Sequence, residues 1–324
     1  MDWKGYYRAE LEAPGVRERI ERWLTDHPVE GVDGIVRRGG VLSFPHTALA
    51  FAGPLQAAVV SELMSGGVDR IIALGVLHSV NLPVYRTALD EQSEPGERES
   101  AFRVVSGAFV PQGTAGGIDT PFGVQPTVSA GSGPIHIDRA GLLADEFSLD
   151  TFFAILRLAA DVHGRRPIPV LPIYVGMSRH PVTGSFDEAQ ALAEWLSGTV
   201  GPATAVVATG DLVHFGSAYG DPSGPEGTPG SGANRSAVEE GFRDRVAQML
   251  ERAMQPDEPE SMTEAYRLSM EELKNDQREI LPILAAFLGT RAFARLLHFE
   301  LSDYAPILDV PDPCLVASAL VAYG

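Results

Sequence analysis

Residues 41–79 read VLSFPHTALAFAGPLQAAVVSELMSGGVDRIIALGVLHS, and this stretch decides the fold. Its two apolar runs, 41–44 and 69–77, are predicted strands, and residues 51–64 between them have the composition of a packed helix. Ser65-Gly66-Gly67 is a typical helix C-terminal signal. The near-continuous hydrophobicity of 69–77 is typical of a strand covered on both faces. The stretch therefore predicts a complete βαβ unit.

The same alternation continues along the rest of the chain. We expect further strands at 102–110, 168–175, 203–208, 296–301 and 315–323, and helices at 14–26, 138–162, 186–197, 237–254, 262–273 and 280–288. The charged residues 91–100 are expected in a surface loop, and a glycine-rich connection follows at 113–123. The pattern predicts an α/β fold: one three-layer domain over residues 1–324, with a mainly parallel or mixed central sheet flanked by helices.

The most loop-like segment is 219–234, YGDPSGPEGTPGSGAN. Its Gly, Pro and Ser content predicts a flexible loop. It begins shortly after His214, so a mobile flap over a site is one interpretation, and a solvated linker is the other.

Composition excludes several classes of partner. The chain has 324 residues, is 44% hydrophobic and carries a formal net charge of −18, which disfavours nucleic acid and anionic membranes as partners. No apolar run is long enough to span a bilayer, and the first residues lack a signal-peptide pattern, so we expect a cytoplasmic protein.

Residue usage excludes several chemistries. Cys314 is the single cysteine, which leaves histidine and carboxylate as metal ligands. Lysine occurs only at Lys4 and Lys274, neither in a phosphate-binding motif, and no GxSxG or strand-following GxGxxG motif is present. We expect no lysine near the candidate site, so a carboxylated substrate would need arginine, helix N-termini or a metal.

Three histidines directly follow predicted strands: His46, His78 and His214. Ligands of α/β proteins collect beyond the carboxyl ends of parallel strands, so a divalent metal with oxygen-dependent or hydrolytic chemistry is the first hypothesis. Each histidine alone could instead be a capping or surface group. His46 and His78 belong to one βαβ unit, which favours a shared ion. We assign no role to His27, His163 or His180.

Carboxylates near these positions are the other candidates. Asp211 lies three residues before His214, and an aspartate that accepts from an imidazole fixes its tautomer; a helix N-cap is the alternative. Glu146 precedes a predicted helix start, where a carboxylate needs no further role. Asp309 lies in the terminal strand pair, where a turn aspartate is the usual explanation.

Seven segments, in order over residues 44–324, resemble the Memo family (AmmeMemoRadiSam system protein B). They are FPHTALAFAGPLQAAVVSEL, IIALGVLHS, DTPFGVQPTV, DEFSLDTFFAIL, PIPVLPIYVG, ATGDLVHFG and LSDYAPILDVPDPCLVASALVAYG. They are similar to the family patterns PHAGYxYSGxxA, ILGPSH, xTPLGxxxVD, EHSLExQLPFL, VPIxVG, SSDxSHYG and GYATSGDV…VVGYAA. The family accompanies radical-SAM proteins in many microbes and is related in fold to class III extradiol dioxygenases.

The resemblance implies roles for the candidate residues. It matches His46 and His78 to metal-binding histidines, and Asp211 and His214 to the pair beside the metal. Asp309 falls at a segment that supplies a third ligand in some relatives. Glu146 keeps the family's carboxylate, whereas Phe147 stands where histidine is usual, which predicts a more apolar pocket.

These observations together predict a non-haem iron(II) oxidoreductase that uses O2 on a small-molecule substrate, with copper or zinc as alternative metals. His46, His78 and Asp309 would hold the metal, and His214, oriented by Asp211 and with Glu146 nearby, would act as general acid and base. A metal-dependent hydrolase and a non-catalytic peptide- or protein-binding module are the alternatives. A homo-oligomer is compatible with the sequence.

Overall fold

The predicted βαβ unit lies at the centre of the structure, a computed structural model that describes residues 1–26, 29–90, 92–113, 116–221, 235–255 and 259–324. Its strands are β1 (Val41–Phe44) and β2 (Arg70–Val76), and its helix is α3 (Leu49–Ser65). β8 (Thr204–Thr209) lies between the two strands and is parallel to both, and β7 (Val170–Val175) is parallel to β2 on its other side. The core of the sheet is therefore parallel, as expected.

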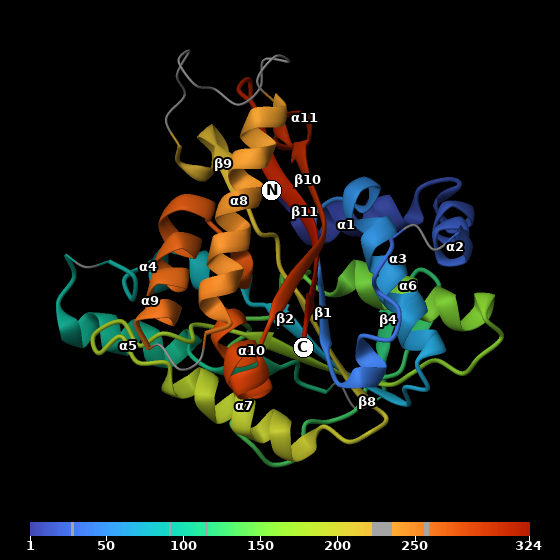
Figure 1. The fold of residues 1–324 in the computed structure, drawn as a ribbon, viewed down its shortest axis with the longest axis horizontal. Coiled ribbons are helices and arrows are strands. Elements are labelled where there is room, and N and C mark those ends of the chain that lie inside the picture. The colour runs from blue at the N-terminus through green and yellow to red at the C-terminus, as the bar shows by residue number, and fades with distance from the viewer. Residues whose placement is uncertain (27–28, 91, 114–115, 222–234, 256–258) are drawn as a thin grey trace.

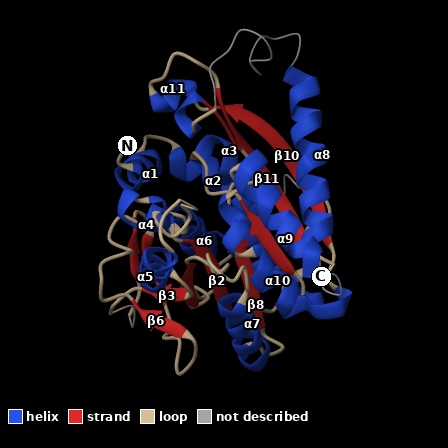
Figure 2. Cartoon of the chain, turned by 90° about the vertical axis from the view of Figure 1, so that its left-hand side faces the viewer, coloured by secondary structure: helices blue, strands red, loops and turns tan. Residues whose placement is uncertain are grey.

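Antiparallel strands extend both edges, so the sheet is mixed. Among the described residues it has nine strands, in the order β10-β11-β1-β8-β2-β7-β3-β6, with β9 paired to β11. The added strands are β3 (Ala108–Val110), β6 (Ile135–Ile137), β9 (His214–Gly216), β10 (Ala294–Asp303) and β11 (Cys314–Tyr323). In Figure 2, β10 and β11 run beside α8 and extend toward α11 (Ala305–Leu308) near the top of the view. The terminal strand pair thus completes the sheet, as its sequence predicts.

Helices cover both faces of this sheet (Figure 1). One layer contains α2 (Val16–Asp26), α3 and α6 (Asp150–Val162), and the other contains α7 (Asp187–Thr199), α8 (Arg235–Ala253), α9 (Pro259–Leu268) and α10 (Leu281–Leu288). The remaining α-helices and strands of the described residues are α1 (Trp3–Glu12), α4 (Pro83–Arg86), α5 (Pro95–Val105) and a small hairpin of β4 (Ile118–Thr120) and β5 (Gly123–Gln125).

Alternation along β2 explains its near-continuous hydrophobicity after Arg70. In β2, Ile71 and Ala73 face the α3 layer, whereas Ile72, Leu74 and Val76 face the α7 layer. Successive side chains of a strand point to opposite faces, so a strand buried on both faces shows no polar positions.

Three predicted elements differ from the structure. The helix predicted over 138–162 begins only at Asp150, as α6. Residues 95–105 form helix α5 where a charged loop was expected, because Pro95 starts the helix and Phe102 and Val105 bury its inner side. The expected strand 102–110 is consequently limited to Ala108–Val110. Of the predicted loop 219–234, residues 222–234 lie outside the described part of the chain. No helix among the described residues is long and apolar enough to cross a membrane.

Candidate metal centre

The carboxyl ends of three parallel strands bring the candidate residues together. β1 leads through Pro45 to His46, β2 leads through Leu77 to His78, and β8 leads through Gly210 to Asp211. These strands are neighbours in the order β1-β8-β2, so their ends meet at one edge. The imidazole rings of His46 and His78 have centroids 5.0 Å apart and are perpendicular, at 89°. The sequence prediction that they face one ion is consistent with this geometry.

Asp276, a residue that the sequence reasoning missed, lies at the centre of the cluster. Its Oδ2 atom is 3.5 Å from Nε2 of His46, 3.7 Å from Nε2 of His78 and 3.5 Å from Nε2 of His214. Asp211 Oδ2 is 3.8 Å from Nε2 of His46 and 3.9 Å from Nε2 of His214. Two overlapping groups can hold a metal ion: His46, His78 and Asp276, and Asp211, His214 and Asp276.

The second nitrogen of each imidazole is held by an acceptor outside the cluster. His46 Nδ1 is 3.2 Å from Thr209 Oγ1, and that hydroxyl donates its proton to the Phe44 carbonyl, so it must accept from His46. His214 Nδ1 donates to the Lys274 carbonyl at 2.8 Å. With Nδ1 as donor, Nε2 of each ring faces the cluster and presents a lone pair to an ion once the ion has displaced any proton there, the arrangement typical of metal-binding histidines.

Glu146 performs the same task for His78 and holds the backbone around it. Its Oε1 accepts from His78 Nδ1 at 3.0 Å, and its Oε2 accepts from the His78 backbone N–H at 2.7 Å. The backbone N–H groups of Phe147 and Ser148 also donate to Oε1, both at 2.9 Å. Four donors on one buried carboxylate fix the orientation of the His78 ring.

The electrostatics of the cluster favour a bound cation. Burial alone would lower the pKa of His78, but the Glu146 and Asp276 carboxylates outweigh burial and raise it to about 10. Burial would raise the pKa of Glu146, yet His78 and the N–H donors lower it to about 2. Burial would likewise raise the pKa of Asp276, but the three imidazoles hold it well below its usual range. Asp276 is therefore an anion at neutral pH.

Asp211 differs from Asp276 in this respect. Burial raises the pKa of Asp211, the Asp276 charge adds to the rise, and His46 and His214 offset part of it. Asp211 Oδ1 accepts from the His46 backbone N–H at 3.0 Å, so this carboxylate also fixes the turn after β1. Two adjacent carboxylates with pKa values displaced in opposite directions are typical of sites in which one carboxylate stays charged and the other can carry a proton.

An unusual turn places Asp276 in the cluster. α9 continues into a π-helical turn (Ser269–Leu273), and Lys274 then adopts a left-handed backbone, φ 50°. The Asp276 backbone N–H donates to the Asp211 carbonyl at 3.0 Å. Irregular helical turns and positive φ values at non-glycine residues are enriched at functional sites.

The structure corrects one expectation about this site and a second about its surroundings. Asp309 caps α11 with φ 54°, is exposed, and belongs to neither of the two groups that could hold a metal ion, whereas Asp276 belongs to both. His214 Nδ1 donates to the Lys274 carbonyl, and Asp211 lies near its other nitrogen, with Oδ2 3.9 Å from Nε2. Lysine is also present after all, because Lys274 lines the pocket, where its Nζ pairs with Asp221 Oδ1 at 2.5 Å.

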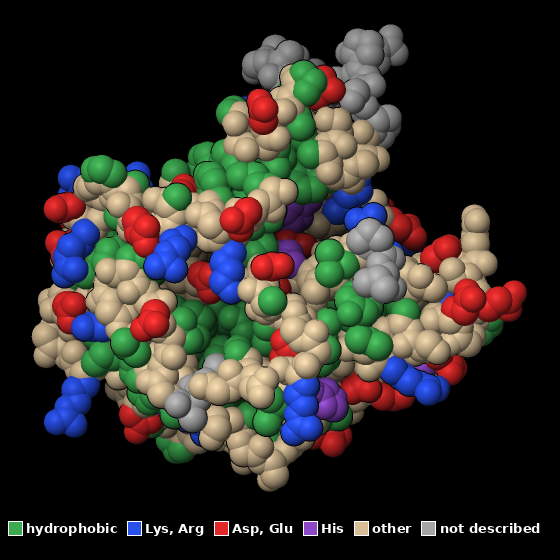
Figure 3. Space-filling model, turned by 180° about the vertical axis from the view of Figure 1, so that it is seen from behind, with side chains coloured by type: hydrophobic (Ala, Val, Ile, Leu, Met, Phe, Trp, Pro, Cys, Tyr) green, Lys and Arg blue, Asp and Glu red, His purple; other side chains and the backbone are tan. Residues whose placement is uncertain are grey.

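A pocket of about 860 Å³ opens over the cluster. Figure 3 shows histidine side chains in a hollow on the face opposite to the view of Figure 1. Phe147 stacks on His78 with ring centroids 4.3 Å apart, and Trp3 and Tyr7 of α1 pack on Phe147. These aromatic rings give the pocket an apolar wall, as expected from Phe147, and the volume suits a small ligand.

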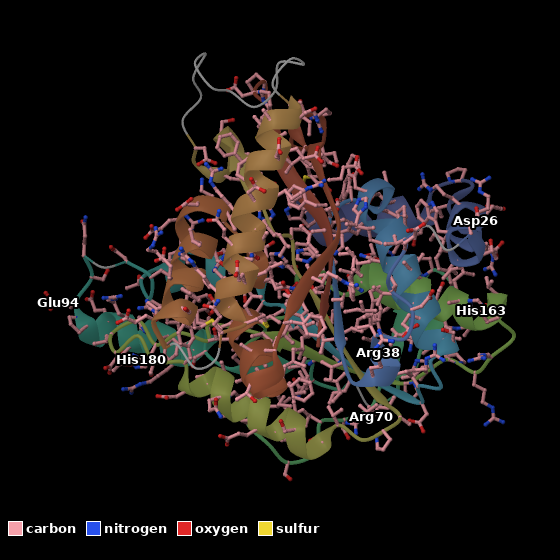
Figure 4. The ribbon with its side chains drawn as sticks, viewed as in Figure 1. Asp26, Arg38, Arg70, Glu94, His163 and His180 are labelled. Carbon is pink, nitrogen blue, oxygen red and sulfur yellow. The ribbon has the colours of Figure 1, made fainter. Side chains whose placement is uncertain are left out.

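The histidines without a predicted role are remote from the pocket where they are described. Figure 4 shows His163 at the end of α6 and His180 near α5, at opposite sides of the view. His27 lies outside the described residues.

The chain matches no protein-family model and no curated protein sequence. Its chemistry must therefore be argued from the cluster itself: three imidazoles and two carboxylates that converge at the floor of a pocket, in a geometry that can hold a metal ion.

Proposed function

We propose that the protein is a metal-dependent oxidoreductase that uses dioxygen on a small molecule, with iron(II) held by His46, His78 and Asp276. The convergence of the histidine Nε2 atoms on Asp276 Oδ2, at 3.5–3.7 Å, carries this proposal. Two histidines and one carboxylate with open positions are the ligand set of non-haem iron(II) oxygenases. Bound iron would supply adjacent positions for substrate and dioxygen, together with one-electron chemistry.

The remaining groups of the cluster have roles in proton transfer and positioning. The Lys274 carbonyl accepts from Nδ1–H of His214 and directs Nε2 into the pocket, where this nitrogen can exchange a proton with a bound substrate. Asp211, whose pKa is raised, lies 3.9 Å from that nitrogen and can exchange the proton. Glu146 and Thr209 keep the other two rings oriented, and the aromatic wall lines the pocket beside them.

The resemblance to the Memo family supports the same assignment from sequence. Four of the residues that it matches, His46, His78, Asp211 and His214, come from three separate segments yet lie in one cluster. The relation of that family to class III extradiol dioxygenases favours oxygen chemistry among the reactions that such a cluster can perform.

Metal analysis of matched variants tests the proposal. Purified protein, stripped with chelator and loaded anaerobically with iron(II), should bind about one iron per chain. Asp276→Asn and His78→Ala should lose most of it, whereas Asp309→Asn, the same change at an exposed position, should retain it. Circular dichroism checks that each variant is folded. Iron retained by a folded Asp276→Asn variant, or absent from the unmodified protein, would refute the proposal.

A metal-dependent hydrolase is the second candidate, because the third imidazole favours it. His214 Nε2 is as close to Asp276 as His46 is, at 3.5 Å, and three histidines with an open position form a common zinc hydrolase set. An oxygen electrode separates the two functions. Oxygen consumption with an added substrate supports the oxidoreductase, and substrate cleavage that proceeds equally without oxygen supports the hydrolase.

A further inference from the structure

Three basic side chains line the pocket of a protein whose net charge is −18: Arg86, Lys274 and Arg278. Their partners differ. Lys274 Nζ is neutralised by Asp221 Oδ1 and also donates to the Tyr219 carbonyl. Arg278 Nε pairs with Glu279 at 3.2 Å. In the part of the chain that the structure describes, the exposed Arg86 has no carboxylate partner, and its Nε donates to a backbone carbonyl.

Asn81 joins the two arginines. Its backbone carbonyl accepts from Arg86 Nε at 2.9 Å, and its side-chain Oδ1 accepts from Arg278 Nη2 at 3.2 Å. Because arginine only donates, Arg278 fixes the orientation of the Asn81 amide, and Nδ2 is left as a donor without a described acceptor. We name Asn81, Arg86 and Arg278 the anion subsite.

An unpaired guanidinium, that of Arg86, and a free amide donor at one place match an oxyanion, while Arg278, itself paired with Glu279, holds the amide in position. The planar guanidinium fork binds a carboxylate through two parallel N–H donors. The one acidic residue of the pocket outside the metal centre, Asp90, accepts from the Gln92 backbone N–H and the Ser93 hydroxyl, so it is engaged elsewhere. Asn81 is also the last residue of the one-turn helix that begins at His78, which connects the anion subsite to the metal centre through one rigid turn.

We propose that the substrate of this pocket is a small organic carboxylate with an apolar body. Its acidic group binds the anion subsite through Arg86 and Asn81. Its apolar body lies against Trp3, Tyr7 and Phe147, beside the metal centre. This inference rests on the proposed function, because it names the substrate class of the same pocket. A local positive charge also offsets the repulsion that an acidic protein exerts on an anion.

Ligand titration of chelator-treated, metal-free protein tests the inference, with benzoate and phenylacetate as probes and benzamide and phenylacetamide as their neutral partners. Trp3 lines the pocket, so its fluorescence reports occupancy, and Trp3→Phe checks the origin of the signal. The acids should bind at least tenfold more tightly than the amides. Arg86→Gln should weaken acid binding about tenfold, in line with the loss of a charge-assisted hydrogen bond.

Arg103→Gln is the matched control. Arg103 is exposed on α5, outside the pocket lining, and pairs with Glu99 at 3.3 Å, so its loss should leave acid binding unchanged. Four outcomes would overturn the inference. They are equal affinity for acid and amide, no saturable signal with either acid, a signal that persists in Trp3→Phe, and unchanged benzoate affinity in Arg86→Gln. Inorganic phosphate that binds more tightly than both acids would overturn the choice of a carboxylate.

The two proposals can fail separately. The titration uses no metal, so Arg86-dependent binding of acids stands even if the iron measurements fail. Iron binding that depends on Asp276, without Arg86-dependent binding of acids, would refute the substrate class alone.

Discussion

Substitution of Gly210 by alanine tests whether the turn that carries Asp276 sets the metal centre. Gly210 directly precedes Asp211 and lies against the backbone of Gln277, the residue after Asp276. A Cβ at Gly210 would be 2.7 Å from the Gln277 Cβ and 3.0 Å from its Cα and N, where ordinary contacts begin at 3.4 Å. The turn would have to move by roughly 0.4–0.7 Å, well beyond the roughly 0.2 Å tolerance of metal–ligand distances.

We expect Gly210→Ala to weaken metal affinity about 10–100-fold, the range for loss of a group that positions ligands. Overpacking should also lower the free energy of unfolding by about 1–3 kcal/mol. Competition titration with a chelating dye measures the affinity, and urea denaturation of the metal-free protein measures stability. Gly198→Ala is the matched control, because a Cβ at Gly198 in α7 meets no atom within 4 Å. It should leave metal affinity unchanged.

Unchanged metal affinity in a folded Gly210→Ala protein would refute this reasoning. It would mean that the turn of residues 274–277 adapts freely and that the position of Asp276 is not set by its contact with Gly210. Equal losses in the two glycine variants would refute it as well, because an added methyl group would then act through general stability.

Three further predictions concern the surroundings of the cluster. Glu146→Gln should weaken metal affinity about 10–100-fold in competition titrations, because a neutral amide orients His78 less strongly; an unchanged Kd would contradict this. Metal affinity should rise by up to about tenfold per pH unit between about pH 7 and 9, because the ion displaces a proton from His78, whose pKa is raised to about 10; a flat profile counts against it. In metal-free protein, the raised pKa of His78 contributes stability that is complete below pH 6.5 and is lost as the pH rises through about 10. The lowered pKa of Glu146 contributes stability that is lost as the pH falls from 4.5 toward about 2. Urea unfolding midpoints measured across pH should show both losses.

The sequence predicts the parallel core because its signals are local. After Asp69 and Arg70, the run 71–77 is apolar, as a strand between two helical layers must be, and Ser65-Gly66-Gly67 ends the helix that precedes it. His46 and His78 could be found by the same logic, since each directly follows a strand of one βαβ unit. Helix α5 was missed because charged residues cover its exposed side, and only Phe102 and Val105 reveal its buried side.

Asp276 could not be found in this way because it follows a helix, not a strand. Its neighbours Lys274 and Asn275 look like an ordinary polar turn, and a carboxylate between two helices carries no signal of its own. The position depends on the left-handed Lys274 and on the contact between Gly210 and Gln277, which join segments far apart in the chain. Asp309 was preferred because the terminal segment resembles a ligand-bearing one, yet it lies exposed at the end of α11.

The wide spread of the ligands along the chain makes the metal centre a late product of folding. His46 and Asp211 are 165 residues apart in the sequence. Lys274, whose carbonyl accepts from His214, lies 60 residues after His214. On a ribosome, the histidines would emerge well before Asp276, so a nascent chain would lack the complete ligand set. If the cluster binds an ion, tight binding would be a property of the finished protein alone, and the ion would stabilise only chains whose last helices have docked.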